Sequence, residues 1–279
     1  MEHHRNFLES EFSAVAPQQA RWHIIPVAVE ETVTYGKGTA AGPQAIIDAS
    51  YYLEAFNGEN CPGEHGIYTS ESIHENWQTD VGTAVKFARE CQAVPFLLGG
   101  EHSITVPAIR ALKEVQPEFG ILHFDAHADL RYEYENSKMS HACAMRRCHE
   151  LGIPIVQIGT RAYSVEELKY RQENSESIFY YDAKTLKHNH IPEEIFPKNF
   201  PQKIYISFDI DALNPAIIPA TGTPEPGGIT WYQALDLLQK TKTKEIIGMD
   251  LVEFAPIKGF HCYDMCAATL AYEMMALCQ

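Results

Sequence analysis

Short apolar runs bounded by turn residues recur along this chain of 279 residues and alternate with longer amphipathic segments. Short runs that lack a polar alternation are typical of strands buried on both faces of a parallel sheet. The runs predict strands at His23–Val29, Val94–Leu98, Phe119–Phe124, Ile153–Ile158, Ser177–Tyr180, Lys203–Phe208 and Glu245–Met249.

Amphipathic segments occupy the intervals between these runs and predict helices. We expect them from Gly42 to about Phe56 and at Asp80–Cys91, Ser103–Val115, Ser164–Gln172, Thr230–Lys240 and Tyr263–Leu277. Pro43 stands in the tolerated first turn of the first helix, and Ser164 and Thr230 are plausible N-caps. Residues 57–76 and 188–202 follow neither pattern. Alternating strands and helices predict an α/β fold of three layers, with a mostly parallel sheet covered by helices on both faces.

The length of the chain allows one large α/β domain or two small ones. No Pro/Gly/Ser-rich linker and no change in charge divides the sequence. We therefore expect a single domain over residues 1–279, in which residues 1–21 form an N-terminal extension.

Side chains that can bind metal stand directly after three of the predicted strands. In open α/β sheets, ligands bind outside the carboxyl ends of the strands. We therefore expect these side chains to converge at one edge of the sheet. They are His102 after the run 94–98, Asp125, His127 and Asp129 after 119–124, and Asp209 and Asp211 after 203–208.

Four carboxylates and two imidazoles, without a thiolate, suit Mn²⁺, with Mg²⁺, Zn²⁺, Fe²⁺ and Ni²⁺ as competitors. Two divalent cations balance four carboxylates, whereas one cation leaves them repelling each other. Two cations also activate a shared water near neutral pH, so the set favours hydrolysis. A lone Asp or His in such a place is usually a turn former, a cap or a solvated residue. The metal hypothesis depends on their joint occurrence.

Five segments resemble the ureohydrolases, the family of arginase and agmatinase: GKGTAAGPQAI, GGEHSIT, HFDAHADLR, SFDIDALNPAIIPATGTPEPGG and GMDLVEFAP. The likeness extends in order from about Trp22 to the C-terminus and implies an arginase-like fold. It also implies two Mn²⁺ ions and, as in the family, a homo-oligomer, either trimer or hexamer. One ion is expected on His102, Asp125, Asp129 and Asp209, and the other on Asp125, His127, Asp209 and Asp211.

The resemblance also implies roles for two catalytic residues: His141 matches a histidine that shuttles protons, and Glu253 matches a glutamate that binds the guanidinium. For the hydrolysis itself, Asp129 is expected to relay a proton to the leaving amine. The sequence departs from the family pattern in that Glu101 and Asn214 each replace an Asp. Ala142-Cys143 replaces a Gly-Thr pair, which affects the local shape behind His141.

The loop Leu130–Ser140 has no hydrophobic period and separates Asp129 from His141, so we expect it at the mouth of the site. It resembles the agmatinases of bacteria and archaea. This resemblance implies hydrolysis of agmatine to putrescine and urea, a step of polyamine biosynthesis. Glu133 and Glu135 are then expected to bind the ammonium of agmatine. The alternative substrate is a guanidino acid such as 4-guanidinobutanoate, held by Arg131.

The sequence disfavours two other classes of function. A non-catalytic, regulatory relative is expected to lack a metal ligand, but all six are present. A two-metal phosphoesterase needs cationic groups at the mouth of its site, where this chain has acidic ones.

The net charge of −15 makes nucleic acid a poor partner and modestly favours a cationic small-molecule substrate. No apolar stretch approaches the length of a membrane span, and the N-terminus lacks the apolar core of a signal peptide. We therefore expect a cytoplasmic protein without a membrane partner. The seven cysteines show no C-x-x-C spacing and are expected to be reduced. Cys143 is expected to be a small buried residue and not a nucleophile.

Overall fold

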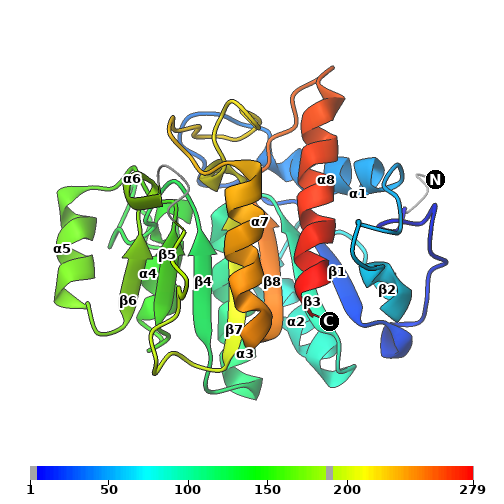
Figure 1. The fold of residues 1–279 in the computed structure, drawn as a ribbon, viewed down its shortest axis with the longest axis horizontal. Coiled ribbons are helices and arrows are strands. Elements are labelled where there is room, and N and C mark those ends of the chain that lie inside the picture. Colours follow the sequence, from blue (N-terminus) through cyan, green and yellow to red (C-terminus); the bar gives the residue numbers. More distant parts are fainter. Residues whose placement is uncertain (1–4, 187–190, 279) are drawn as a thin grey trace.

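A computed structural model of the chain describes residues 5–186 and 191–278, so parts of the N-terminal extension and of the 188–202 segment lie outside it. One eight-stranded sheet extends through the described residues in the order β2-β1-β3-β8-β7-β4-β5-β6, and every pairing is parallel (Figure 1). The strands are β1 (Trp22–Val27), β2 (Ile67–Thr69), β3 (Val94–Gly99), β4 (Gly120–Phe124), β5 (Ile155–Ile158), β6 (Ile178–Tyr181), β7 (Lys203–Asp209) and β8 (Glu245–Val252).

All seven predicted strands are present. The eighth, β2, lies inside the unassigned segment 57–76 and pairs with β1 at the edge of the sheet. Strand β8 continues to Val252, three residues beyond its predicted end, because it pairs with β7 as far as Asp209. The extra residues bring the chain to Glu253 at the edge where the candidate ligands stand.

The helices are α1 (Gly42–Ser50), α2 (Trp77–Glu90), α3 (Thr105–Val115), α4 (Ala144–His149), α5 (Val165–Glu173), α6 (Ala183–Leu186), α7 (Trp231–Gln239) and α8 (His261–Met275). Six were predicted, whereas the short α4 and α6 were not. Helix α1 ends at Ser50, before the expected Phe56, and is followed by turns. Ser164 and Thr230 both form complete capping boxes, with Glu167 and Gln233 as the third residues of their helices.

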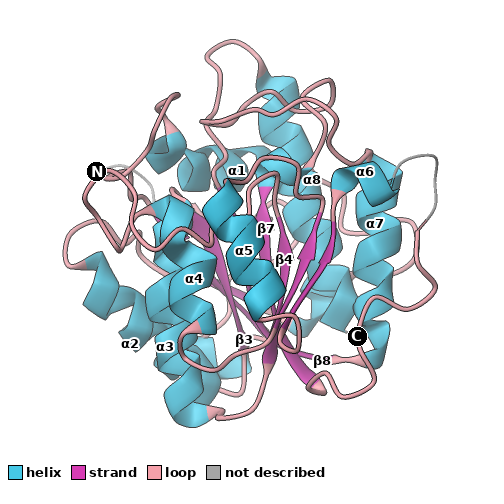
Figure 2. Cartoon of the chain, turned by 90° about the vertical axis from the view of Figure 1, so that its left-hand side faces the viewer, coloured by secondary structure: helices cyan, strands magenta, loops and turns pink. Residues whose placement is uncertain are grey.

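Helices cover both faces of the sheet, as predicted. In Figure 2, α2, α3 and α4 lie on one side of the strands, and α7 and α8 lie on the other. Each face has its own apolar core. One core contains buried residues of α1, α7 and α8, and the other contains buried residues of α2, α3 and α4.

The described part of the N-terminal extension packs onto the first of these cores. Phe7 and Leu8 are fully buried there. Their backbone N–H groups donate to the hydroxyls of Thr69 and Ser50, so the extension is fixed to β2 and α1.

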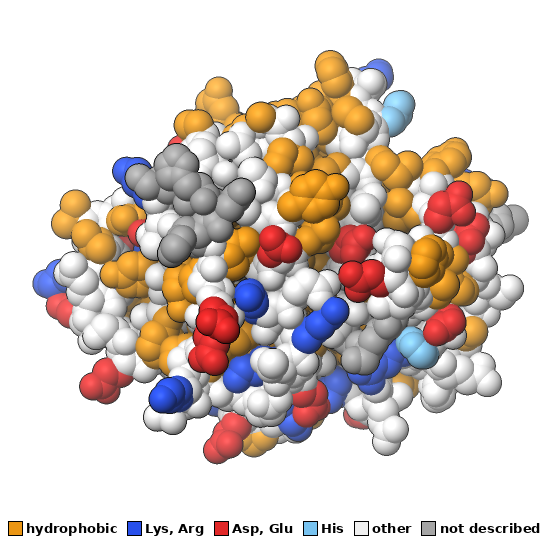
Figure 3. All heavy atoms as spheres, in the orientation of Figure 1, with side chains coloured by type: hydrophobic (Ala, Val, Ile, Leu, Met, Phe, Trp, Pro, Cys, Tyr) orange, Lys and Arg blue, Asp and Glu red, His pale blue; other side chains and the backbone are white. Residues whose placement is uncertain are grey.

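The surface shows no segregation of charge on the face drawn in Figure 3, where basic side chains are scattered among acidic ones. In the part of the chain that the structure describes, no helix combines the length and the apolar character needed to cross a membrane.

The register of the central strands sets their carboxyl ends level with each other. Leu98 of β3 pairs with Leu251 of β8, Phe124 of β4 with Phe208 of β7, and Asp209 with Val252. Because the strands are parallel, the residues that follow them meet at one edge of the sheet. These are the segments that contain the candidate metal ligands and Glu253.

Candidate active site

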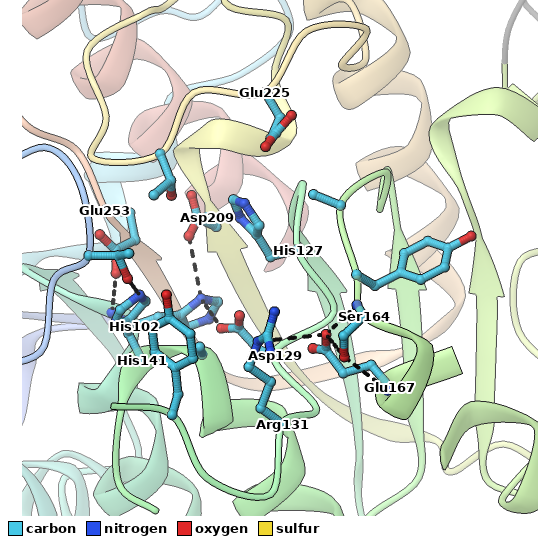
Figure 4. Close-up of a pocket in the computed structure, with 16 residues that line it drawn as sticks. His102, His127, Asp129, Arg131, His141, Ser164, Glu167, Asp209, Glu225 and Glu253 are labelled. Carbon is cyan, nitrogen blue, oxygen red and sulfur yellow. Dashed lines mark hydrogen bonds and ion pairs between the residues drawn. The ribbon is translucent and has the colours of Figure 1, made fainter. Parts of the chain in front are cut away.

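A cavity of about 410 Å³ opens at this edge of the sheet, within the size range of small-molecule sites. Four of the six predicted metal ligands line it, together with the predicted catalytic residues His141 and Glu253 (Figure 4). The remaining two ligands, Asp125 and Asp211, are buried and do not line the cavity, but they contact His102 and His127.

His102 faces three of the carboxylates. Its Nδ1 lies 3.2 Å from an oxygen of Asp125, 3.2 Å from one of Asp129 and 3.5 Å from one of Asp209. Nδ1 is buried and makes no hydrogen bond to any of them. The other ring nitrogen contacts the hydroxyl of Ser207 at 2.8 Å, which fixes the ring. One nitrogen and three oxygens that converge without hydrogen bonding fit the ligand set of a divalent cation.

His127 forms the second half of the cluster. Its Nδ1 lies 3.1 Å from Oδ2 of Asp211 and 3.4 Å from Oδ1 of Asp125. Oδ2 of Asp211 is buried and has no hydrogen-bond partner, whereas Oδ1 accepts from the N–H of Ala126. A second cation fits here.

Asp125 and Asp209 each contact both halves. Asp125 directs Oδ2 toward His102 and Oδ1 toward His127. Asp209 directs Oδ2 toward His102, while its Oδ1 accepts from the N–H of Asp211. These are the positions expected of the two bridging carboxylates.

Buried carboxylates dominate the electrostatics of the cluster, and they also raise the pKa of His102 and of His127. Burial and the neighbouring Asp125 carboxylate raise the pKa of Asp129 well above its usual range. Burial and the Asp211 carboxylate raise the pKa of Asp209 in the same way. Carboxylates this close cannot all ionise unless positive charge stands between them.

Glu253 is held at the cavity wall by its backbone and by one hydrogen bond. Its φ of 62° lies in the left-handed region, which is uncommon for a residue with a side chain. Its N–H donates to the carbonyl of Gly100, and its Oε1 accepts from the N–H of His102 at 2.8 Å. Only glycine fits at position 100, because a Cβ there would lie 1.9 Å from the carbonyl oxygen of Val29. Burial raises the pKa of Glu253 to about 8.

His141 is held between two threonines of the segment after β1. Its Nδ1 lies 3.1 Å from Oγ1 of Thr32, and its Nε2 lies 3.1 Å from Oγ1 of Thr34. Thr32 donates its hydroxyl proton to the buried carboxylate of Glu101, so its oxygen accepts from Nδ1–H of His141. The proton of neutral His141 is therefore on Nδ1, and Nε2 is the basic nitrogen. Burial lowers the pKa of His141, which favours this neutral form.

Glu101 and Asn214, which stand where the family pattern has Asp, both stabilise local backbone structure. Glu101 also accepts from the N–H groups of Glu31 and Thr32 and from the hydroxyl of Ser103, so it fixes the segment that contacts His141. Asn214 accepts from the N–H of Ala216, as expected of an Asn in a turn.

The acidic loop only partly reaches the cavity. Arg131 and Tyr134 line it, with the Arg131 guanidinium over the Tyr134 ring and its Nε 3.8 Å from Glu167. Glu133 and Glu135 are exposed and do not line the cavity. Their assignment to the ammonium of the substrate therefore stays a prediction that has no support from their position.

Glu225 and Glu167 are lining carboxylates that the sequence pattern did not single out. Glu225 lies within TGTPEPGG, in a loop after Asp211 that has no hydrophobic period. Its carbonyl accepts from the guanidinium of Arg161, which also donates to the carbonyls of Asp211 and Ala212. An acidic residue in a loop that follows a ligand strand was the signal available for Glu225.

The site and fold agree with comparisons to known proteins. The chain is 34% identical over 286 residues to the N(1)-aminopropylagmatine ureohydrolase of Synechocystis sp., covering 97% of this chain and 93% of the relative. It is 28% identical to the agmatinase of Pyrococcus horikoshii, over 98% of this chain and 97% of that protein. The crystal structure of the agmatine ureohydrolase of Thermoplasma volcanium superposes with a TM-score of 0.86 at 27% identity, covering 100% of this chain and 95% of that one.

The model of the arginase family matches residues 20–277, which include every candidate ligand and catalytic residue named above. Enzymes of this family depend on a binuclear metal centre. Among the described residues, two clusters of side chains could hold metal ions, one of His102, His123, Asp125 and Asp129 and the other of Asp125, His127 and Asp211. This chain belongs to the arginase family and is a ureohydrolase.

Proposed function

We propose that this enzyme hydrolyses the guanidinium group of a cationic guanidino amine, with agmatine giving putrescine and urea. The observation that carries the proposal is that Glu253 and Glu225 line the same cavity as the metal cluster, Glu253 next to His102 and Glu225 in the loop after Asp211 (Figure 4). A substrate with a cation at each end matches such a cavity.

The two groups of side chains would hold two Mn²⁺ ions, with Asp125 and Asp209 shared between them. Buried carboxylate and imidazole ligands without a thiolate favour Mn²⁺ among the divalent metals. When bound, such a pair of cations supplies an activated water as the nucleophile for hydrolysis.

The residues of the chain bind the substrate and move protons. Glu253 accepts hydrogen bonds from the N–H groups of the guanidinium and so holds the guanidinium carbon over the cluster. This orientation lowers the activation barrier of hydrolysis. The leaving amine needs a proton, which Asp129 would deliver from its place beside His102. His141 would exchange that proton with solvent through Nε2, the nitrogen that faces the hydroxyl of Thr34.

Glu225 is the proposed partner of the ammonium at the far end of the substrate. No hydrogen bond or ion pair within the described residues engages its carboxylate, whereas Glu167 is occupied by the capping box of α5 and by the N–H of Leu130. The backbone contact to Arg161 holds Glu225 at the cavity, so little order has to be gained on binding.

N(1)-aminopropylagmatine is the second candidate substrate, because relatives with that name are 34% and 35% identical to this chain. It keeps the guanidinium end and carries cationic nitrogens beyond it, which the same carboxylate can bind. A guanidino acid fits less well. Arg131, its expected partner, already faces Glu167, and Glu225 would repel a carboxylate.

Urea release from a panel of guanidino compounds tests the proposal. We expect a higher kcat/KM for agmatine and N(1)-aminopropylagmatine than for arginine and 4-guanidinobutanoate, and the ratio between the first two selects the preferred amine. A higher kcat/KM for either acid would refute the cationic-amine assignment while leaving the ureohydrolase chemistry in place. We also expect the enzyme to act in the cytoplasm. We expect it to form a homo-oligomer, which a measurement of its mass in solution tests.

A further inference from the structure

A chain of buried side chains leads from the shared carboxylate Asp125 to the far edge of the sheet. It begins at His123 of β4, whose Nε2 lies 2.9 Å from Oδ2 of Asp125. It continues through Gln157 of β5 and Arg171 of α5 and ends at Asp182. His123, Gln157 and Arg171 are completely buried.

The orientation of the Gln157 amide is fixed from two sides. Its Oε1 faces Nε of Arg171 at 2.8 Å, and arginine can only donate. Its Nε2 faces the carbonyl of Ala128 at 2.7 Å, and a carbonyl can only accept. Rotating the amide by 180° would place two donors together on one side and two acceptors together on the other.

The Gln157 amide in turn determines which ring nitrogen of His123 carries the proton. Nε2 of Gln157 lies 3.0 Å from Nδ1 of His123 and donates to it, so Nδ1 carries no proton. The proton of the neutral ring is then on Nε2, where it is donated to the Asp125 carboxylate. Both nitrogens of His123 are thus engaged, which leaves it no lone pair for a metal ion.

We propose that His123 is a positioning residue for the metal centre: by its bond to Oδ2 it fixes the Asp125 carboxylate, which directs Oδ2 toward His102 and Oδ1 toward His127, and Gln157 and Arg171 keep His123 in the donating tautomer. Asp125 contacts both halves of the cluster, so a rotation of its carboxylate would disturb both at once. Hydrogen-bond partners behind metal ligands typically change metal affinity by about 10- to 100-fold. The inference rests on the two-metal centre of the proposed function and not on the choice of substrate.

Replacement of His123 tests whether the donated proton matters. We expect His123→Leu to weaken Mn²⁺ binding by about 10- to 100-fold, as measured by calorimetric titration of chelator-treated protein. In His123→Gln the amide N–H takes the place of Nε2–H, so Mn²⁺ binding is expected within a few-fold of the parent protein. The metal-free unfolding free energy, measured alongside, separates loss of metal from loss of fold.

His149 supplies the matched control. Its two ring nitrogens are also both engaged, by Tyr170 at 2.6 Å and by Ser177 at 2.9 Å, but it contacts no candidate ligand. His149→Leu should leave the Mn²⁺ affinity unchanged. Unchanged affinity in His123→Leu, or equal losses in His123→Leu and His123→Gln, would overturn the proposal.

Gln157→Leu tests the tautomer without touching the ring. Nδ1 of His123 then loses its donor, the proton can move to it, and the bond to Asp125 is lost. We expect Gln157→Leu to bind Mn²⁺ more weakly. In the double variant with His123→Gln, Mn²⁺ affinity should recover, because the amide N–H of glutamine donates without depending on a tautomer. A double variant that binds Mn²⁺ no better than Gln157→Leu would refute the role of the hydrogen-bonded series His123, Gln157 and Arg171. Activity with any guanidino substrate is not needed for these results, so they stay separate from the test of function.

Discussion

His141 occupies a place where its two nitrogens have different tasks. Nδ1–H is donated to Thr32, whose own proton goes to Glu101, so the lone pair for proton exchange is on Nε2, which faces the hydroxyl of Thr34. The Tyr134 ring packs against the imidazole at an interplanar angle of 83° and limits its rotation. The arrangement fits a base that stays neutral and in one orientation.

We expect His141→Asn to lower kcat by about 100-fold, the usual contribution of a positioned acid–base group, while both metal ions stay bound. Because burial lowers the pKa of His141, its protonation limits the activity of the parent enzyme only below about pH 6.5, the ordinary value for histidine. Turnover, metal analysis and the pH profile of kcat measure the three effects. Loss of metal from the variant would assign His141 a structural or ligand role instead.

Glu225→Gln removes the charge that we assign to the far end of the substrate and keeps the shape of the side chain. We expect kcat/KM for agmatine to fall by about fivefold or more, which corresponds to a partly exposed charge pair of about 1 kcal/mol. The rate with 4-guanidinobutanoate should rise or stay constant. Glu133→Gln, an exposed carboxylate outside the cavity, is the matched control and should change neither rate. If Glu133→Gln lowers kcat/KM for agmatine and Glu225→Gln does not, the ammonium is bound by the acidic loop and not by Glu225.

Cys143 shows how far a sequence can predict the environment of one residue. It was expected to be buried and inert, and its side chain is fully buried. Burial raises its pKa to about 11, so almost no thiolate forms at pH 8. In contrast, no pattern placed Glu225 at the cavity, because its position depends on backbone carbonyls that accept from Arg161. A hydrogen bond between a side chain and the carbonyl of a residue 64 positions away leaves little trace in the order of residues.

At the scale of elements, the start of α5 connects helix stability to the site. Glu167 closes the capping box with Ser164 through Oε2 and accepts from the N–H of Leu130 through Oε1. Leu130 directly follows the candidate ligand Asp129, which itself has a positive φ of 52°. One carboxylate therefore fixes both the helix and the backbone beside a ligand.

Ser164→Ala should lower the free energy of unfolding by about 1 kcal/mol, the usual cost of losing an N-cap. Thr230→Ala removes an equivalent capping box at α7, which does not line the cavity, and should cost a similar amount. Only Ser164→Ala is expected to raise KM, since Ser164 lines the cavity. Urea denaturation and steady-state kinetics measure both variants. Equal KM values in the two variants would show that the cap acts on stability alone.

The predicted strands were recognised as apolar runs bounded by turn residues, even where they have only four residues, as in β5 and β6. The six predicted helices have 9 to 15 residues, enough for the apolar period to show. Strand β2 has three residues, Ile67–Thr69, and acquires its conformation from pairing with β1. Helix α6 has only four residues. Such short elements are set by tertiary contacts and not by local pattern.

At the scale of the molecule, the buried carboxylates make stability depend on metal. Because Asp129 and Asp209 repel their neighbours without a cation, the chelated protein should unfold at a lower temperature than the Mn²⁺-loaded one. Free metal at 100 times its Kd stabilises by about 2.7 kcal/mol per site. Scanning calorimetry with chelator, and again after Mn²⁺ is restored, measures the difference.

Asp209→Ala is the control for this effect, because it removes a ligand that both ions share. The variant should contain less metal, lack activity and show a smaller change on chelation than the parent protein. Equal midpoints for the chelated and loaded parent protein would contradict a structural contribution of the metal centre.

The position of β8 has a consequence for how the chain comes to be folded. In the described sheet, β8 is the only strand that joins the β2-β1-β3 part to the β7-β4-β5-β6 part. His102 follows β3, whereas the carboxylates follow β4 and β7. Strand β8 also follows the other seven described strands in sequence, so the chain that precedes it has no described strand to hold the two parts together. Such distant pairing predicts slow, cooperative folding, and we expect the centre to be assembled only after β8 has paired with β3 and β7.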